Sequence, residues 1–265
     1  MAMLSKRCFL AALSLSLAML TIGGAQAQTA LDGILKTKVI KIGVPTDYPP
    51  YGFVGPDLKP MGLDIDVAAL IAAKLGVTAE LVPVVSANRI PFLQTGKVDL
   101  IVSTLGRNEE RMKVIDFSVA YAPFYQGVFA RKDVSVKSFD DLAGRTVAVT
   151  RGAMEDEMLG KVAPPTTEVK RFEDQAATAA AFVAGQTEAI ATSVSTVGVI
   201  AQKNPALGVE YKLLLRDSPC FVGIGKGEVA LQAKVNDILL AARADGTLEK
   251  LSQKWLKRGT GDLPL

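Results

Sequence analysis

The chain has 265 residues, of which 49% are hydrophobic and 22% are charged, with 30 basic and 27 acidic side chains. This length and apolar fraction predict one large or two modest globular domains, and they exclude a disordered or collagen-like chain. The net charge of +3 is spread evenly along the sequence and is too small for a nucleic-acid-binding surface, so no nucleic-acid partner is expected. The absence of histidine excludes histidine-based triads and zinc sites. We predict no cofactor and no metal site, and any enzyme would have to use carboxylates, lysine or a thiol.

The first 27 residues have the pattern of a cleavable export signal. Lys6 and Arg7 form a basic start, residues 9–22 form an apolar stretch, and residues 25–27 form a small-x-small cleavage site. The apolar stretch has 14 residues, which disfavours a membrane anchor because about 20 are needed to cross a bilayer. We therefore expect a periplasmic protein. Its mature chain keeps only Cys220, so an intramolecular disulfide is excluded.

Strand patterns then alternate with helix patterns, which predicts an α/β architecture. The expected strands lie at residues 39–44, 81–85, 98–103, 146–150 and 188–192. Helices are expected at residues 64–75, 88–95 and 174–184, directly after Asn108 and Gly152, and in two amphipathic segments on either side of Gly246.

An internal similarity between residues 93–103 and 182–192 predicts two similar lobes. Each segment has an apolar helix end, a glycine, an acid, a buried strand and a final hydroxyl residue. A chance match is the alternative, since helix-Gly-strand junctions are common in α/β proteins. If the similarity is real, each lobe presents a hydroxyl at the carboxyl edge of its sheet, where ligands bind in open α/β sheets. Two such edges facing each other would form a cleft between domains.

Arg111 is the strongest candidate for a ligand-binding residue in this cleft. It falls in the first turn of a predicted helix, close to Ser103 and Thr104, and a guanidinium beside hydroxyls and free N–H groups can bind a carboxylate. Residues 150–154 read as a strand, a Gly turn and a helix start, whose N–H groups would form a second anion site.

Each of these residues also has an ordinary structural explanation. Arg111 could be a surface arginine paired with Glu109 or Asp116, and Tyr48 could simply be an aromatic residue in a turn. Neither residue decides the function by itself.

Several short motifs occur in order along the chain. They are residues 48–51 (YPPY), 62–66 (GLDID), 93–100 (LQTGKVDL), 109–111 (EER), 115–118 (IDFS), 141–149 (DLAGRTVAV) and 244–247 (ADGT). Together they resemble the family 3 extracellular solute-binding proteins of ABC importers, of the polar amino acid binding type, over essentially the whole mature chain.

The resemblance implies a two-lobed periplasmic binding protein fold of type II with two hinge crossings. Lobe 1 would comprise residues 28–122 and 219–265, and lobe 2 residues 123–218. It also implies a monomeric binding protein rather than an enzyme, which captures a small carboxylate ligand, an amino acid or close derivative, by hinge closure. Its second partner would be an inner-membrane ABC permease.

The resemblance also implies roles for single residues. Arg111 is similar to the arginine that binds the ligand α-carboxylate, and Tyr48 to the aromatic lid over the ligand side chain. Ser103 and Thr104 are similar to the positions that receive the α-ammonium. The lobe 2 turn that completes the carboxylate site is matched by Gly152, Ala153 and Met154.

Three positions depart from the family pattern. Gly106 stands at a position that is often serine, and Ser86 stands where a bulky or aromatic residue often packs against the ligand. Ser193 stands where the amino acid binders carry the aspartate that pairs with the α-ammonium. A desolvated ammonium without a carboxylate is costly. Either Glu155 supplies the missing charge, or the ligand lacks a free α-ammonium.

Arg89 and Arg151 lie near the expected cleft, where they could receive a second anionic group. The alternative is that both are solvent-facing arginines. The sequence leaves these possibilities open.

A periplasmic carboxylate-processing enzyme is the rival function, because the superfamily resembles dehydratases that act on carboxylated cyclohexadienes. Such chemistry needs a positioned acid, and residues 189–201 contain no carboxylate. An extracellular sensor domain is a third possibility, disfavoured because no membrane segment follows residue 27. Cys220 has no histidine partner and is expected to be a buried or hinge-adjacent thiol.

Overall fold

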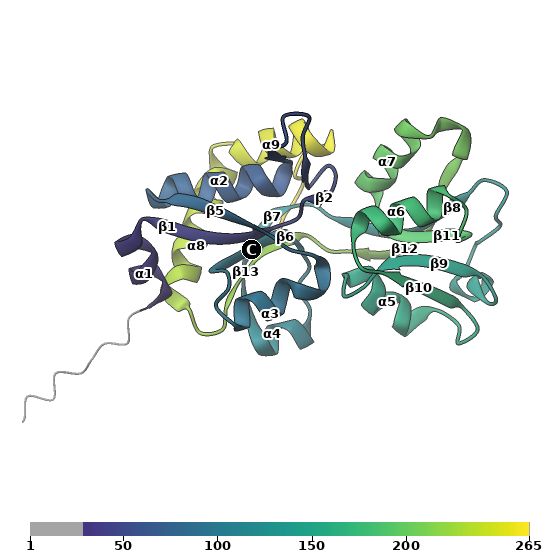
Figure 1. Cartoon of the computed structure of the whole chain (residues 1–265), viewed down its shortest axis with the longest axis horizontal. Coiled ribbons are helices and arrows are strands. Elements are labelled where there is room, and N and C mark those ends of the chain that lie inside the picture. Colours follow the sequence, from purple (N-terminus) through teal and green to yellow (C-terminus); the bar gives the residue numbers. More distant parts are fainter. Residues whose placement is uncertain (1–28, 265) are drawn as a thin grey trace, which may run out of the picture.

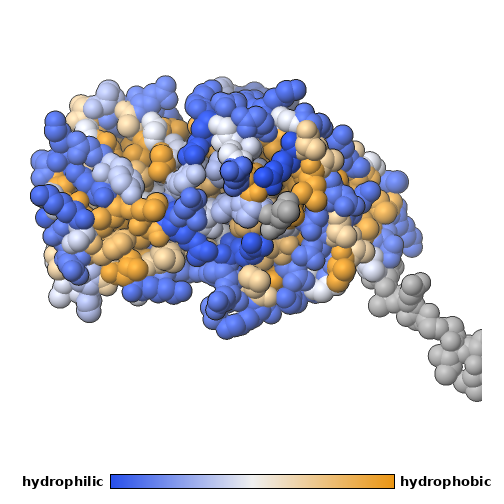
Figure 2. Space-filling view, turned by 180° about the vertical axis from the view of Figure 1, so that it is seen from behind, coloured by the Kyte–Doolittle hydropathy of each residue, from blue (hydrophilic) through white to orange (hydrophobic). Residues whose placement is uncertain are grey.

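The computed structural model describes residues 29–264, so the predicted export signal lies outside the described residues. The described chain forms two lobes, each built on a five-stranded sheet covered by helices on both faces (Figure 1). The predicted α/β architecture is confirmed. Viewed from behind, a notch separates the lobes at one edge, and hydrophilic residues lie on both of its sides (Figure 2). Within residues 29–264, no helix has both the length and the hydropathy needed to cross a bilayer.

Lobe 1 contains the larger core. Its strands are β1 (Val39–Val44), β5 (Thr78–Pro83), β6 (Leu100–Leu105), β7 (Ile115–Ala122) and β13 (Cys220–Gly225). Its helices are α1 (Ala30–Thr37), α2 (Leu63–Leu75), α3 (Arg89–Gln94), α4 (Glu109–Val114), α8 (Val229–Ala244) and α9 (Thr247–Leu256). The strand order is β5-β1-β6-β13-β7, in which β1 is parallel to β5 and β6, and β13 is antiparallel to β6 and β7. One face packs against α1, α2, α8 and α9, and the other packs against α3.

Lobe 2 repeats this plan. Its strands are β8 (Tyr125–Arg131), β9 (Thr146–Thr150), β10 (Glu168–Phe172), β11 (Ala189–Ser193) and β12 (Val209–Asp217). Its helices are α5 (Met154–Val162), α6 (Gln175–Val183) and α7 (Val194–Lys203). The strand order is β10-β9-β11-β8-β12, with β9 parallel to β10 and β11 and with β8 antiparallel to β11 and β12. One face packs against α5 and the other packs against α6 and α7.

The internal similarity seen in the sequence corresponds to equivalent places in the two lobes. In lobe 1, α3 is followed by Gly96 and β6; in lobe 2, α6 is followed by Gly185 and β11. Both glycines have positive φ, 65° and 75°, which lets the chain reverse after the helix with no strain on a side chain. Strands β6 and β11 are buried along their whole length, as parallel strands covered on both faces should be.

The chain crosses between the lobes twice, from β7 to β8 and from β12 to β13, and the crossing segments run side by side (Figure 1). Ala122 pairs with Cys220 on the lobe 1 side. Between the two sheets, the N–H of Ser218 donates a hydrogen bond to the carbonyl of Phe124 at 3.0 Å. Cys220 is buried, and burial raises the pKa of its thiol well above the usual value. Of the two expected states of this thiol, buried or hinge-adjacent, burial is confirmed.

A small three-stranded sheet extends lobe 1 beside the notch. It contains β2 (Asp47–Tyr48), β3 (Gly52–Val54) and β4 (Pro60–Met61), and it brings Tyr48 close to the partner lobe. Helix α6 of lobe 2 packs against β2. The segment around Tyr48, which the sequence indicates to be a turn, therefore forms part of the contact between the lobes.

Candidate functional site at the lobe interface

Arg111 is positioned by the start of α4. The side chain of Asn108 caps this helix, because its Oδ1 accepts a hydrogen bond from the N–H of Arg111 at 2.9 Å. The guanidinium is only 5% exposed and is directed at lobe 2. Its Nε and Nη2 donate to Oε1 of Glu157 on α5 at 3.1 and 2.6 Å, and its Nη1 donates to the carbonyl of Gly106 at 3.0 Å.

The alternative explanation of Arg111 as a surface arginine is therefore wrong. Glu109 is exposed at the start of α4, and Asp116 instead forms an ion pair with Lys226 at 2.8 Å. The true partner, Glu157, lies in the other lobe, where its second oxygen also accepts a hydrogen bond from Nδ2 of Asn108 at 2.6 Å. Arg111 thus holds a carboxylate between the lobes.

Arg89 lies beside Arg111 and is also buried, with 4% exposure. Its Nε and Nη1 donate to the carbonyls of Ser86 and Ser103 at 3.0 and 2.8 Å. The carbonyl of Gly152, in lobe 2, accepts from Nη2 of both arginines at 3.3 Å. Burial, followed by the charge of Arg111, lowers the pKa of Arg89 to about 10. Two cations therefore converge on one backbone turn of the opposite lobe.

Asp64, which the sequence marks only as the start of a helix, supports the carboxyl end of β6 from behind. Its Oδ2 accepts from the N–H of Thr104 at 2.9 Å, and its Oδ1 accepts from the hydroxyl of Tyr121 at 2.8 Å. Thr104 has a φ of 44°, an uncommon value for a residue with a side chain. Burial raises the pKa of Asp64 to about 7, although both hydrogen bonds and Arg89 oppose the rise. In the sequence, the only indication of this role of Asp64 is that an acid lies within a turn of an apolar helix.

The lobe 2 turn is less free to bind an anion than expected. The N–H of Gly152 donates to Oδ2 of Asp156 at 3.1 Å, and the N–H of Ala153 donates to the carbonyl of Thr150 at 3.1 Å. Of the three N–H groups assigned to a second anion site, only that of Met154 has no partner in the described part of the chain. The sequence prediction did not include Asp156. This carboxylate lies in the first turn of α5 and accepts the N–H of Gly152, which precedes the helix.

Met154 and Glu155 follow this turn and are both buried. A Cβ on Gly106 would lie 2.8 Å from the terminal methyl of Met154, so the glycine leaves room for this lobe 2 side chain. A serine at position 106, which the resemblance leads one to expect, would require the end of the flexible Met154 side chain to move. Glu155 is 4% exposed, and its Oε1 is buried without a hydrogen-bond partner.

Tyr48 and Ser193 meet on the far side of the interface. The hydroxyl of Tyr48 lies 3.5 Å from Oγ1 of Thr192 in lobe 2, and its ring lies 5.2 Å from that of Tyr51. Ser193 caps α7: its Oγ accepts from the N–H of Thr196 at 3.1 Å and lies 2.8 Å from the hydroxyl of the same residue. The hydroxyl at position 193 is therefore committed to its own helix.

Further contacts across the interface were not anticipated. Oδ2 of Asp47 accepts from the N–H of Gln175 at 2.7 Å, the hydroxyl of Thr196 donates to the carbonyl of Pro49 at 3.4 Å, and Nη2 of Arg216 donates to the carbonyl of Arg107 at 3.0 Å. No local sequence pattern marks these contacts, because each joins residues from different lobes. The structure therefore describes a closed arrangement.

Most of the predicted ligand-binding residues come together here, but one does not. Arg151 is half exposed and forms an ion pair with Glu173 at 2.9 Å on the surface. It follows a buried strand residue, so the alternating direction of side chains turns it outward. Ser86 contributes its carbonyl to Arg89 rather than a side chain that packs against a ligand.

A family model for bacterial extracellular solute-binding proteins, family 3, matches residues 40–258. The chain belongs to this family. Its members include the ABC transporter glutamine-binding protein GlnH of Bacillus subtilis (strain 168), which is 31% identical over 223 residues, covering 82% of this chain and 81% of GlnH.

Solved structures of two-lobed amino acid-binding proteins have the same fold. A mutant of the arginine-binding protein ArgBP from T. maritima has a TM-score of 0.80 at 29% identity, covering 86% of this chain and 99% of that one. An ancestral amino acid-binding protein, AncCDT-1, described as a precursor of cyclohexadienyl dehydratase, has a TM-score of 0.77 at 31% identity, with coverage of 86% and 99%. The predicted two-lobed fold and family are thus confirmed.

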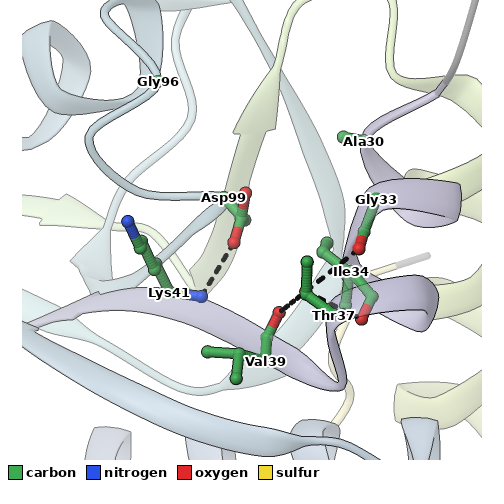
Figure 3. Close-up of a pocket in the computed structure, with 8 residues that line it drawn as sticks. All are labelled: Ala30, Gly33, Ile34, Thr37, Val39, Lys41, Gly96 and Asp99. Carbon is green, nitrogen blue, oxygen red and sulfur yellow. Dashed lines mark hydrogen bonds between the residues drawn. The ribbon is translucent and has the colours of Figure 1, made fainter.

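A separate pocket of about 390 Å³ lies at the opposite edge of the lobe 1 sheet (Figure 3). Lys41 and Asp99 lie next to each other on one side of it, where Oδ2 of Asp99 accepts a hydrogen bond from the N–H of Lys41 at 2.7 Å, and Gly33 and Thr37 lie on the other side. The pocket adjoins the amino end of β1, whereas the family 3 site is expected at the carboxyl ends of the strands. We therefore place the candidate site at the lobe interface.

Proposed function

We propose that this chain is the periplasmic substrate-binding component of an ABC importer and that it binds a small carboxylate ligand, an amino acid or close derivative, between its lobes. Membership of the family and the names of its relatives support this function. The observation that carries it is Arg111, a buried guanidinium at the interface that already holds the carboxylate of Glu157. The geometry that binds one carboxylate there suits another.

In this proposal, the ligand carboxylate replaces that of Glu157 on Arg111. Lobe 1 would bind first, and the turn at Gly152 would then close over the ligand with Met154 and its free N–H. Residues 122–125 and 217–220, where the two strands cross, would be the hinges that separate residues 28–122 and 219–265 from residues 123–218. A ligand that contacts both lobes stabilises the closed state by its differential affinity for it.

The proposal has three further parts. The signal at residues 1–27 would direct export, the protein would act as a monomer, and it would deliver its ligand to an inner-membrane permease. Residues 29–264 contain no group of three metal-ligating side chains, and the proposed role requires no cofactor. The closed face of both lobes would be the part recognised by the permease.

Matched substitutions of two arginines test the function. Thermal shift and calorimetry would be run on the wild type with L-glutamine, L-arginine and L-cystine. A ligand at 100 times its Kd adds about 2.7 kcal/mol, which corresponds to roughly 5–10 °C at this size. Arg111→Met should weaken binding by about 1000-fold, because a buried charge contact is lost. Arg151→Met, at the surface, should leave the affinity unchanged.

Circular dichroism would show that both variants are folded. If the wild type bound none of the probes, the ligand class would be wrong. Equal affinity of Arg111→Met and wild type would remove Arg111 from the site.

A carboxylate-processing enzyme is the second candidate, and Glu155 is the observation that favours it. The lack of a carboxylate in residues 189–201 does not leave the lobe 2 face without an acid, because Glu155 reaches the interface from α5. Burial raises its pKa, which suits a proton donor. Incubation with a carboxylated cyclohexadienol distinguishes the two functions. In an enzyme, Glu155 would protonate the hydroxyl, which leaves as water while the carboxylate leaves as carbon dioxide, and the ring would become aromatic with an increase in ultraviolet absorbance. A binding protein would leave the compound unchanged.

A further inference from the structure

Two buried oxygen atoms of lobe 2 have no hydrogen-bond partner in the described part of the chain. They are Oε1 of Glu155, in the first turn of α5, and Oε1 of Gln126, near the start of β8. The two side chains are 4% and 2% exposed, and Gln126 lies close enough to the Glu155 carboxylate to lower its pKa. Buried acceptors are nearly always paired, so this pair lacks a donor.

A donor is missing at each of these oxygens, and the two side chains lie within reach of each other. Glu155 is not in an ion pair with either buried arginine, although the charges of Arg89 and Arg111 both favour its ionised form. A primary ammonium carries three N–H donors and a positive charge, which suits an amide oxygen beside a carboxylate.

Glu155 differs from the other buried carboxylate of the interface in having an oxygen without a partner. Both oxygens of Asp64 already accept hydrogen bonds from lobe 1, Glu157 is held by Arg111, and Asp47 and Arg216 bond to backbone groups across the interface. A ligand ammonium at Glu155 would compensate its buried carboxylate, whereas a ligand without one would leave that oxygen unpaired.

Ser193 does not fill the same role. Its hydroxyl is engaged with Thr196 at the cap of α7, and a neutral hydroxyl could not neutralise an ammonium. Gln126 pairs directly with Ser193 between β8 and β11, so the amide lies next to the position where the family carries its aspartate.

We propose that Glu155 and Gln126 bind the α-ammonium of the ligand, so that the ligands are amino acids with a free α-ammonium. The inference rests on the proposed function and specifies its ligand class. It excludes carboxylates and derivatives that lack the amino group.

The test compares Glu155→Gln with wild type on paired probes that differ only in the α-amino group. The pairs are L-glutamine with glutaramic acid, and L-arginine with 5-guanidinopentanoic acid, and the pair whose amino acid binds the wild type is used. Calorimetry should show a loss of about 100-fold for the amino acid in the variant and less than about threefold for the des-amino partner. Glu168→Gln, which removes an exposed lobe 2 carboxylate, is the matched control and should change neither affinity.

Other measurements separate a binding role from a structural one. The empty Glu155→Gln protein should melt at the same temperature as wild type or higher, because an unpaired buried carboxylate is removed. If Glu155→Gln does not fold, Gln126→Leu takes its place, with an expected selective loss of about tenfold for the amino acid.

Two results would overturn the inference while leaving the proposed function intact. One is a loss in Glu155→Gln that is equal for the amino acid and its des-amino partner. The other is wild-type protein that binds the des-amino acid as tightly as the amino acid through Arg111. If no amino acid binds the wild type, the proposed function and the inference fail together.

Discussion

The two lobes share a strand order and a helix-Gly-strand junction, but the chain that follows the repeated strand differs between them. At the start of the repeated strand the lobes agree: the carboxylate of Asp99 accepts from the N–H of Lys41 at 2.7 Å, and that of Glu188 accepts from the N–H of Thr146 at 3.1 Å. In each lobe, an acid before the repeated strand therefore bonds to the neighbouring parallel strand, β1 or β9. Equivalent local sequence therefore gives equivalent structure at this end.

The lobes differ where the strand ends. In lobe 1, β6 is followed by three residues before α4, which leaves backbone carbonyls at Ser103 and Gly106 for the two arginines. In lobe 2, β11 runs directly into α7, so Ser193 caps that helix. The chain that follows the strand decides whether its polar end faces a partner lobe or serves its own helix.

The largest expected effect comes from the buried acid behind the lobe 1 strand end, and Asp64→Asn tests it. The folded-state pKa of about 7 lies above the usual value of 3.8, so the protonated form is favoured by folding. This contribution is complete below about pH 4 and is lost as the pH rises to 7. Between pH 5 and pH 8 the wild type should lose roughly 2–3 kcal/mol of stability at this group.

Chemical denaturation at several pH values would measure this slope in wild type and in Asp64→Asn, and the variant should have the flatter profile. Glu155→Gln is the matched lobe 2 variant, because burial raises the pKa of Glu155 in the same direction. Parallel profiles for Asp64→Asn and wild type would show that Asp64 is not the group that titrates.

The next effect concerns the turn through which lobe 2 meets lobe 1. Gly152 has a φ of 69°, and a Cβ there would lie 2.9 Å from Cα of Ala87 in lobe 1. Gly152→Ala should therefore hinder closure and weaken ligand binding by about tenfold, or roughly 1.4 kcal/mol. Gly144→Ala is the control, because Gly144 has a φ of 73° but no atom within 4 Å of the added Cβ.

Calorimetry would compare the two variants. Both carry the cost of a side chain at positive φ, so any difference in affinity reports the contact with Ala87. An equal change in both would mean that closure does not bring Gly152 against lobe 1.

More of the fold than of the candidate site could be predicted from the sequence. Strand β1 and helix α2 are predictable because each is a buried apolar segment, and Gly76, at a φ of 69°, ends the helix. Strand β12 was not anticipated, because it is bulged and pairs antiparallel to β8 in the crossing region. Pattern reasoning detects elements that bury a regular face and misses a bulged edge strand such as β12, of which only Leu213 and Leu215 are buried.

The same limit applied to the site. The position of Arg111 in a first helical turn indicated that it binds a carboxylate, but spacing could not show that Glu157, 46 residues later, is its partner. Three acids lie in the first turn of α5, and each has a different role: Asp156 caps the turn, Glu157 crosses to lobe 1, and Glu155 stays buried. Only the packing of the two lobes separates them.

The serine at the end of β11 gives a smaller effect. Ser193→Ala removes the side-chain cap of α7 and should cost about 1 kcal/mol of stability, because the N–H of Thr196 loses its acceptor. Ser103→Ala, near the end of β6 in lobe 1, should cost less because its carbonyl, not its hydroxyl, holds Arg89. Denaturant titration measures both, and a larger loss for Ser103→Ala would contradict the assignment of the cap.

The smallest effect tests what the lobes have in common. Asp99→Ala and Glu188→Ala each remove one carboxylate acceptor from an N–H of the neighbouring strand, β1 or β9, and each should cost about 0.5–1 kcal/mol. Hydrogen exchange at the amides of Lys41 and Thr146 would measure the loss locally, so that unfolding of one lobe does not obscure the other. Faster exchange at both amides by a similar factor would mean that the two junctions are equivalent in energy as well as in geometry. Protection lost in one lobe alone would show that the shared pattern of glycine, acid and strand stabilises only that lobe.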